Sequence, residues 1–182
     1  MFLTASHGSF WINEMTADKK KPYRWLDSVN DPRQARNVRA FLDTIAYAEG
    51  TILFGNADGY NVIVSGQLFD DYTDHPRVRV HLPRYGVWST AAGRYQLLSK
   101  YFDYYSKKLD LPGFDPASQD EIACWQIREQ GAWGDVLAGR IESAINKCRN
   151  IWASFPGAGY GQREVKTKEL MARYALRGGE FS

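Results

Sequence analysis

The sequence lacks any apolar run that approaches the ~20 residues a membrane-spanning helix requires. Its opening stretch, MFLTASHGSFWINEM, also lacks a basic start, a continuous apolar centre and a small-residue cleavage site, so it does not predict a signal peptide. We therefore expect synthesis in the cytoplasm, without a membrane anchor.

Strong charge of either sign is missing as well. The formal net charge of +2 is too small for a dedicated nucleic-acid-binding protein, and no long basic stripe follows the chain. The one basic run, Lys19–Lys20–Lys21, lies in a polar segment and is interpreted as a solvated stretch.

Cysteine and the common catalytic motifs are scarce. Cys124 and Cys148 lie in separate predicted helices, and neither has a Cys or His at metal-ligand spacing, which argues against a zinc site. We interpret them as buried free thiols, with a disulfide left open if their helices pack closely. No G-x-S-x-G, P-loop or H-E-x-x-H motif occurs, and His7, His75 and His81 are scattered. We expect no cofactor and no metal.

Aromatic residues, in contrast, are plentiful. The chain of 182 residues contains 11 Tyr, 9 Phe and 6 Trp, and its length suits one domain with a core. Such side chains fill cores, and they also line sugar-binding clefts because the apolar face of a pyranose ring stacks on them.

The chain divides into a polar N-terminal extension, residues 1–30, and one domain, residues 31–182. Asp31–Pro32 predicts a helix start, and Gly50 predicts its end after Glu49. Between them the apolar positions have helical spacing and form one buried face: Val38, Phe41, Leu42, Ile45 and Ala48.

The remaining segments predict an α+β fold. Residues 51–88 are punctuated by glycines and contain two β-like runs, NVIVSG and RVRVHL, which predict a small β-lobe. Further helices are expected from Ser89–Thr90 to Pro112, from Asp115 to about Gly131, from about Asp135 to Ser154, and from the end of the loop PGAGYGQ to about Arg177. We expect a cleft where the β-lobe meets the helices.

Glu49 is the strongest candidate for chemistry. It continues the apolar face four residues after Ile45 and is the last helical residue before Gly50. Burial and the negative end of the helix dipole both disfavour the carboxylate, so both raise its pKa and keep an acid available near neutral pH. On position alone, a glutamate that simply reaches solvent remains the alternative.

Two loops are also rich in potential ligand groups. The segment from Asp70 to His75 carries many oxygen ligands but lacks the spacing and central glycine of an EF-hand, so we favour substrate contact or internal hydrogen bonding over calcium. The glycines of PGAGYGQ allow Tyr160 and Gln162 to approach a ligand closely.

From about Ala35 to Gly178 the chain resembles the lambda-type phage endolysins, which are lytic transglycosylases with a lysozyme-like fold. The resemblance rests on four stretches in matching order and spacing: FLDTIAYAEGT at 41–51, GYNVIVSGQLFDDYTDHPR at 59–77, STAAGRYQLLSKYFDYY at 89–105, and NIWASFPGAGYGQ at 150–162. The resemblance implies that Glu49 is the catalytic glutamate, that residues 92–96 contact sugar opposite it, and that residues 78–90 and 156–162 form the lips of the cleft.

The chain departs from the family at two places. Tyr47–Ala48 replaces Trp-Ser before the glutamate. The lip RVRVHLPRYGVW also differs in sequence from the family, so the resemblance does not assign its contacts with the glycan subsites. Within this frame the candidates for orienting the sugar are Ser89, Tyr95, Gln96, Tyr160 and Gln162, and the candidate stacking surfaces are Trp88 and Trp152. For Trp152 a core role is an equal alternative.

The family reaction needs one carboxyl group, and only Glu49 has a convincing environment. The resemblance implies cleavage between N-acetylmuramic acid and N-acetylglucosamine with closure of a 1,6-anhydro ring. One alternative is a hydrolytic muramidase with Asp58, Asp70 or Asp71 as second carboxylate. Another is a non-catalytic peptidoglycan-binding module.

The expected partners follow from the same resemblance. They are peptidoglycan glycan strands and, because no export signal is present, a holin that releases the protein from the host cytoplasm to act in the periplasm. We expect a monomer.

Overall fold

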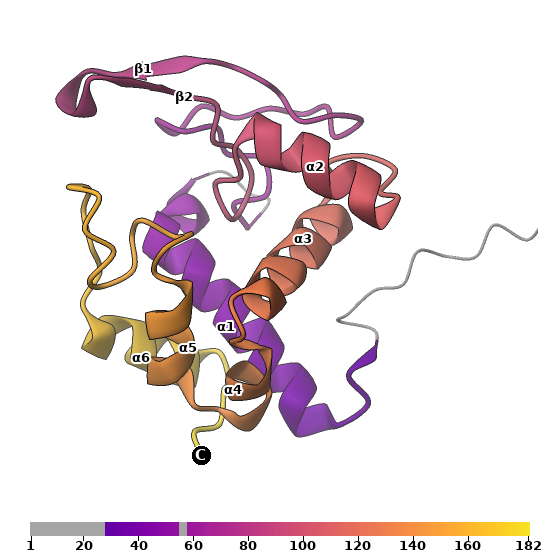
Figure 1. The fold of residues 1–182 in the computed structure, drawn as a ribbon, viewed down its shortest axis with the longest axis vertical. Helices are drawn as coiled ribbons and strands as arrows, with labels where there is room; N and C mark the ends of the chain where they lie inside the picture. The colour runs from indigo at the N-terminus through magenta and orange to yellow at the C-terminus, as the bar shows by residue number, and fades with distance from the viewer. Residues whose placement is uncertain (1–27, 55–57) are drawn as a thin grey trace, which may run out of the picture.

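The structure, a computed structural model, describes residues 28–54 and 58–182. The predictions for residues 1–27, including most of the N-terminal extension, His7 and the lysine run, lie outside the described residues. In the described part the α+β class is confirmed, since the fold consists of six α-helices and one two-stranded antiparallel sheet at the edge of the molecule (Figure 1). No helix in these two ranges is long and apolar enough to cross a membrane.

Helix α1, Pro32–Glu49, forms the centre of the domain. The Asp31 side chain caps it by accepting hydrogen bonds from the backbone N–H groups of Arg33 and Gln34, and Gly50 ends it with a left-handed φ of 75°. Both ends agree with the sequence prediction. The predicted apolar face is buried throughout, and Phe41 and Ile45 are fully enclosed.

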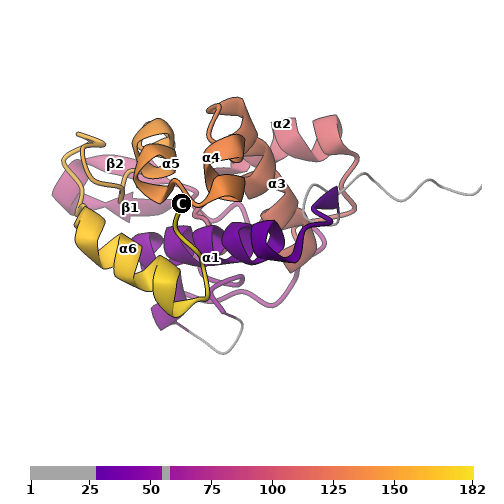
Figure 2. The same ribbon diagram turned by 90° about the horizontal axis from the view of Figure 1, so that it is seen from below.

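Four further helices enclose α1: α3 (Pro116–Glu129), α4 (Trp133–Ala138), α5 (Ile141–Cys148) and α6 (Thr167–Leu176). Helix α1 packs mainly against α4 and α6. Figure 1 shows α1 crossing the molecule from the α4 end towards the sheet, and Figure 2 shows α6 and α4 on different sides of it. The C-terminal end of α1, with Glu49, therefore points towards the β-lobe.

The β-lobe is smaller than predicted. Strands β1 (Val80–Leu82) and β2 (Val87–Ser89) form an antiparallel hairpin through a 3-10 turn, Pro83–Tyr85. The run NVIVSG forms only isolated bridges, because Ser65 and Gly66 both adopt positive φ and reverse the chain so that Val62 pairs with Leu68.

The helix predicted to begin at Ser89–Thr90 begins only at Ser99, so the first ten residues of the prediction are wrong. Helix α2 covers Ser99–Leu109, and the residues before it form a tight turn. Ala92 and Leu97 exchange two backbone hydrogen bonds, of 3.0 and 2.9 Å, across a loop in which Gly93 has φ 76° and Gln96 has φ 50°. Positive φ at two positions is incompatible with a helix, so the helical spacing of the apolar residues there was misleading.

The single helix predicted from Asp135 to Ser154 is also wrong. Gly139 ends α4 with φ 80°, and a separate helix α5 follows and stops at Cys148. A side chain at Gly139 would collide with the backbone carbonyl of Glu180, so the C-terminal segment requires glycine there. Cys124 and Cys148 are both free and buried, as predicted.

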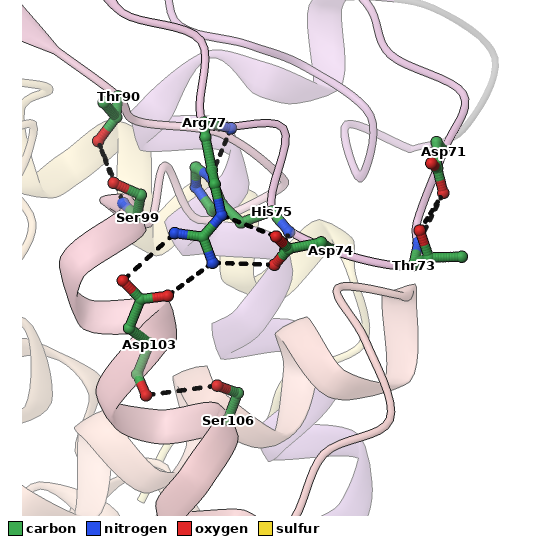
Figure 3. A network of polar contacts seen from close by, with 9 residues as sticks. All are labelled: Asp71, Thr73, Asp74, His75, Arg77, Thr90, Ser99, Asp103 and Ser106. Atoms are coloured by element: carbon green, nitrogen blue, oxygen red, sulfur yellow. Dashed lines mark hydrogen bonds and ion pairs between the residues drawn. The ribbon is translucent and has the colours of Figure 1, made fainter.

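The segment from Asp74 to Arg77 is held on α2 and on the turn before it through His75 and Arg77 (Figure 3). The His75 ring is buried and uses both nitrogens: Nε2 lies 2.9 Å from the carbonyl oxygen of Leu97, and Nδ1 accepts from the backbone N–H of Arg77 at 3.0 Å. Arg77 bridges the carboxylates of Asp74 and Asp103. The two hydrogen bonds of the His75 ring require a neutral imidazole with its proton on Nε2.

Protonation of His75 should therefore destabilise the domain. Burial lowers the pKa of His75 below its usual 6.5, so the unfolded chain takes up the proton first as the pH falls. The contribution of His75 to stability is complete above pH 6.5 and is lost below it. We expect thermal unfolding between pH 7.5 and 5 to show a smaller fall in Tm for His75→Gln than for the wild type. An equal fall in both proteins would contradict this.

Candidate active site

A cleft of about 690 Å³ opens at the C-terminal end of α1. Its walls come from distant parts of the chain: the turn around residues 62–66, the hairpin, the turn and helix start at residues 91–105, and the segment 150–162. This size lies within the ~300–1,000 Å³ usual for ligand sites. The predicted meeting of β-lobe and helices at a cleft is confirmed.

Glu49 lines this cleft as the last residue of α1. Its carboxylate oxygen Oε1 accepts a hydrogen bond of 2.6 Å from the hydroxyl of Ser154. Although the residue as a whole is only half-buried, its carboxyl group is desolvated, and this burial raises its pKa from 4.5 to about 7. The hydrogen bond from Ser154 opposes the shift without cancelling it. The direction of this shift agrees with the sequence prediction, and burial is its main cause.

Glu49 is the only carboxylate that lines the cleft within the described residues. Asp58 lies on a turn where its backbone carbonyl accepts from the Arg94 guanidinium. Asp71 accepts two hydrogen bonds from Thr73, and Asp70 is exposed beside it. The internal hydrogen bonding expected for the loop from Asp70 to His75 is thus observed, and no second carboxylate faces Glu49 from the described residues of the cleft wall.

The arrangement matches known proteins. The endolysin family model matches residues 39–181. The chain belongs to the endolysin family. It is 51% identical over 145 residues to the endolysin of Escherichia phage lambda, covering 78% of this chain and 90% of that protein. It is 49% identical over 156 residues to the endolysin of Escherichia phage P2, covering 79% and 94%.

Solved structures of the family have the same fold. The bacteriophage lambda lysozyme complexed with a chitohexasaccharide superposes with a TM-score of 0.78 at 48% identity, covering 81% of this chain and 97% of that chain. A second structure of lysozyme from bacteriophage lambda gives a TM-score of 0.75, again at 48% identity, covering 81% and 97%. The lysozyme-like fold expected from the sequence is confirmed.

The structure places most of the predicted sugar-contacting residues in the cleft wall, where their role stays a prediction. Those that line the cleft are Ser89, Tyr95, Gln96, Trp152, Tyr160 and Gln162. Several already have protein partners. The Tyr95 hydroxyl donates to Asp120 at 2.6 Å, and the Gln96 side chain donates to two backbone carbonyls. Trp152 is only 3% exposed and packs on Phe155, so it belongs to the core, and it also borders the cleft.

Trp88 is the exception. In the hairpin it pairs with His81, whereas Leu82 and Ser89, on alternate positions, line the cleft. Successive strand residues point to opposite faces, so Trp88 points away from the cleft, and it is 60% exposed. The geometry does not support stacking of a sugar on Trp88 inside the cleft.

The sequence analysis missed the hydrogen-bond partner of Glu49 and several residues of the cleft wall. Ser154 lies 105 positions after Glu49, and only its place within the resembling stretch NIWASFPGAGYGQ pointed to it. Tyr101, Tyr105 and Gln126 also line the cleft, from α2 and α3. Helical spacing shows which residues share one face of a helix, but it does not show which face borders a cleft.

Replacing Ser154 with Ala should raise the pKa of Glu49 further. The lost hydroxyl stabilises the carboxylate, so its removal favours the protonated form. We expect the alkaline limb of the pH–activity profile to move to higher pH. Ser106→Ala, whose hydroxyl makes only a 3.4 Å contact with a backbone carbonyl on α2, is the matched control. A limb that stays in place or moves to lower pH would contradict the assigned contact.

Proposed function

We propose that the chain cleaves the glycan strands of peptidoglycan between N-acetylmuramic acid and N-acetylglucosamine, as a lytic transglycosylase. The observation that carries this proposal is the desolvated carboxyl group of Glu49, with a pKa of about 7, as the one carboxylate among the described residues that line the cleft. Family membership supports peptidoglycan as the substrate. The solved relative that holds a chitohexasaccharide supports a glycan of β-linked N-acetylglucosamine type in the cleft.

In the proposed reaction Glu49 first acts as an acid. It transfers its proton to the glycosidic oxygen, the bond from that oxygen to C1 of the muramoyl residue breaks, and the N-acetylglucosamine end leaves with a free hydroxyl. The muramoyl N-acetyl oxygen stabilises the positive charge at C1. A raised carboxyl pKa is what this step requires.

Glu49 then acts as a base. Its carboxylate removes the proton from the muramoyl 6-hydroxyl while that oxygen bonds to C1, which closes a 1,6-anhydro ring and restores the protonated acid. No water is consumed, so one carboxyl group suffices. A hydrolase of the usual kind needs a second carboxylate at about 5–9.5 Å, and none of the described residues that line the cleft supplies one.

The ends of the released fragments test this proposal. After digestion of sacculi, mass spectrometry with borohydride treatment should show anhydro-muramoyl ends that resist reduction. Digestion in H₂¹⁸O should leave those ends without label. Reducible ends that carry ¹⁸O would show hydrolysis, and binding without release would show a non-catalytic module.

The route to the wall is part of the same proposal. We propose synthesis in the host cytoplasm, release by a holin, and action in the periplasm as a monomer. Sedimentation of the purified chain and lysis assays with and without a co-expressed holin test these points.

A further inference from the structure

The outer face of the β1–β2 hairpin carries a cationic and aromatic cluster that the proposed reaction does not use. Trp88 and His81 are register partners with ring centroids 4.9 Å apart, and the Arg79 guanidinium lies 5.3 Å from the centre of the Trp88 ring. All three side chains are exposed, and Trp88 keeps 60% of its surface in solvent. We use the name outer hairpin cluster for these three residues together with Arg84, which is exposed in the turn that joins β1 to β2.

The charge of this cluster is not neutralised by the described residues. The sequence contains no acidic residue from His75 to Phe102. Arg77, nearby in sequence, is held by two carboxylates (Figure 3), and Arg94 is paired with Asp43. Arg79 and Arg84 form no ion pair with any residue in the ranges 28–54 and 58–182 and contact aromatic rings instead. An exposed guanidinium held on a ring is pre-organised to receive an anion.

We propose that the outer hairpin cluster binds the carboxylates of the peptide stems carried by the muramoyl residues of the glycan strand. This inference rests on the proposed function and extends it from the glycan to its peptide substituents. The stems are short peptides with free carboxylates, so their charge is complementary to Arg79 and Arg84. Trp88 supplies an apolar surface for their alkyl side chains.

The dimensions of the hairpin allow one glycan strand to lie on its inner face while a peptide stem of that strand reaches its outer face. Leu82 and Ser89 face the cleft, so a glycan bound there lies against the inner face of the same hairpin. Two strands ~4.8 Å apart make a wall on the order of 10 Å across. An extended peptide rises ~3.3 Å per residue, so a stem of about three residues spans that wall and reaches the outer face.

The experiment compares two substrates, intact sacculi and glycan strands freed of peptides by an amidase. In Arg79→Gln/Arg84→Gln the KM for sacculi should rise about fivefold to tenfold, a modest effect because exposed charge pairs contribute little each. Turnover of peptide-free strands should not change. The Arg79→Lys/Arg84→Lys protein keeps the charge and should retain most of the affinity. High salt should reduce the difference between wild type and the Gln variant, since screening weakens exposed charges.

A binding assay separates this inference from the proposed reaction. Co-sedimentation with sacculi, in a Glu49→Gln background, measures the affinity that the outer hairpin cluster contributes without any cleavage. If the cluster binds sacculi but the chain cleaves nothing, the proposed function is wrong and this inference still stands. If the Gln variant lost equal affinity for sacculi and for peptide-free strands, the arginines would contact the glycan. If it lost affinity for neither, the arginines would have no role in binding. A loss of binding to phosphatidylglycerol vesicles with unchanged binding to sacculi would point to a membrane. Each of these three results overturns the inference.

Discussion

Glu49→Gln is expected to lose nearly all lytic activity while keeping its fold. The amide has the shape of the protonated acid but cannot transfer a proton to the glycosidic oxygen. General acid–base catalysis contributes about 10²–10⁴-fold, so the rate of clearing of permeabilised Gram-negative cells should fall by at least that factor.

Stability provides the control for this substitution. The carboxyl group is desolvated and its pKa is raised to about 7, so its ionised form is disfavoured by the fold as the pH rises from 4.5 through 7. An uncharged amide avoids that cost, and Glu49→Gln should unfold at a temperature no lower than the wild type at pH 8. Glu169→Gln, an exposed glutamate on α6, should retain full activity. Near-full activity of Glu49→Gln would refute the role assigned to Glu49.

Asp43→Ala is expected to cause the largest loss of stability. The Asp43 carboxylate is buried in α1 and receives Arg94 at 2.9 Å, Arg173 at 2.5 Å and Arg177 at 3.3 Å. Arg94 is itself only 6% exposed. Removing the acid would leave that guanidinium buried without its carboxylate, which costs about 3–5 kcal/mol.

Asp43→Ala should also disturb the wall of the cleft. Arg94 precedes Tyr95 and Gln96, which line the cleft, and its backbone carbonyl accepts from the Thr51 hydroxyl at 2.8 Å. Denaturant unfolding measures the loss of stability. Glu180→Gln, which breaks half-exposed ion pairs with Arg33 and Arg36, is the control and should cost no more than about 1 kcal/mol. A cost for Asp43→Ala as small as that of the control would contradict the structural role of this network.

Features encoded by neighbouring residues could be predicted from the sequence. The start of α1 follows from Asp31 and Pro32, and its end from Gly50, because capping depends on residues within one turn of the helix. The burial of Glu49 followed from its position on the apolar face of the same helix. Both predictions use a single periodic element, for which sequence patterns are most informative.

Features that depend on distant contacts could not be predicted in this way. The turn at residues 92–97 has the apolar spacing of a helix, but bonds between Arg94 and residues of α1, α3 and the turn at Asp58 hold it in another conformation. The direction of Trp88 depended on the register of a hairpin whose alternation was visible in RVRVHL only. Ser154 reaches Glu49 through the packing of the whole domain.

The pKa of Glu49 tests the central claim most directly, because the proposed reaction needs a protonated carboxyl group near neutral pH. It can be measured by ¹³C-detected NMR titration of the glutamate carboxyl carbons, with Glu49→Gln assigning the signal. The structure predicts a midpoint of about 7. A midpoint at the ordinary value of 4.5 would mean that Glu49 is ionised at neutral pH and cannot serve as the acid.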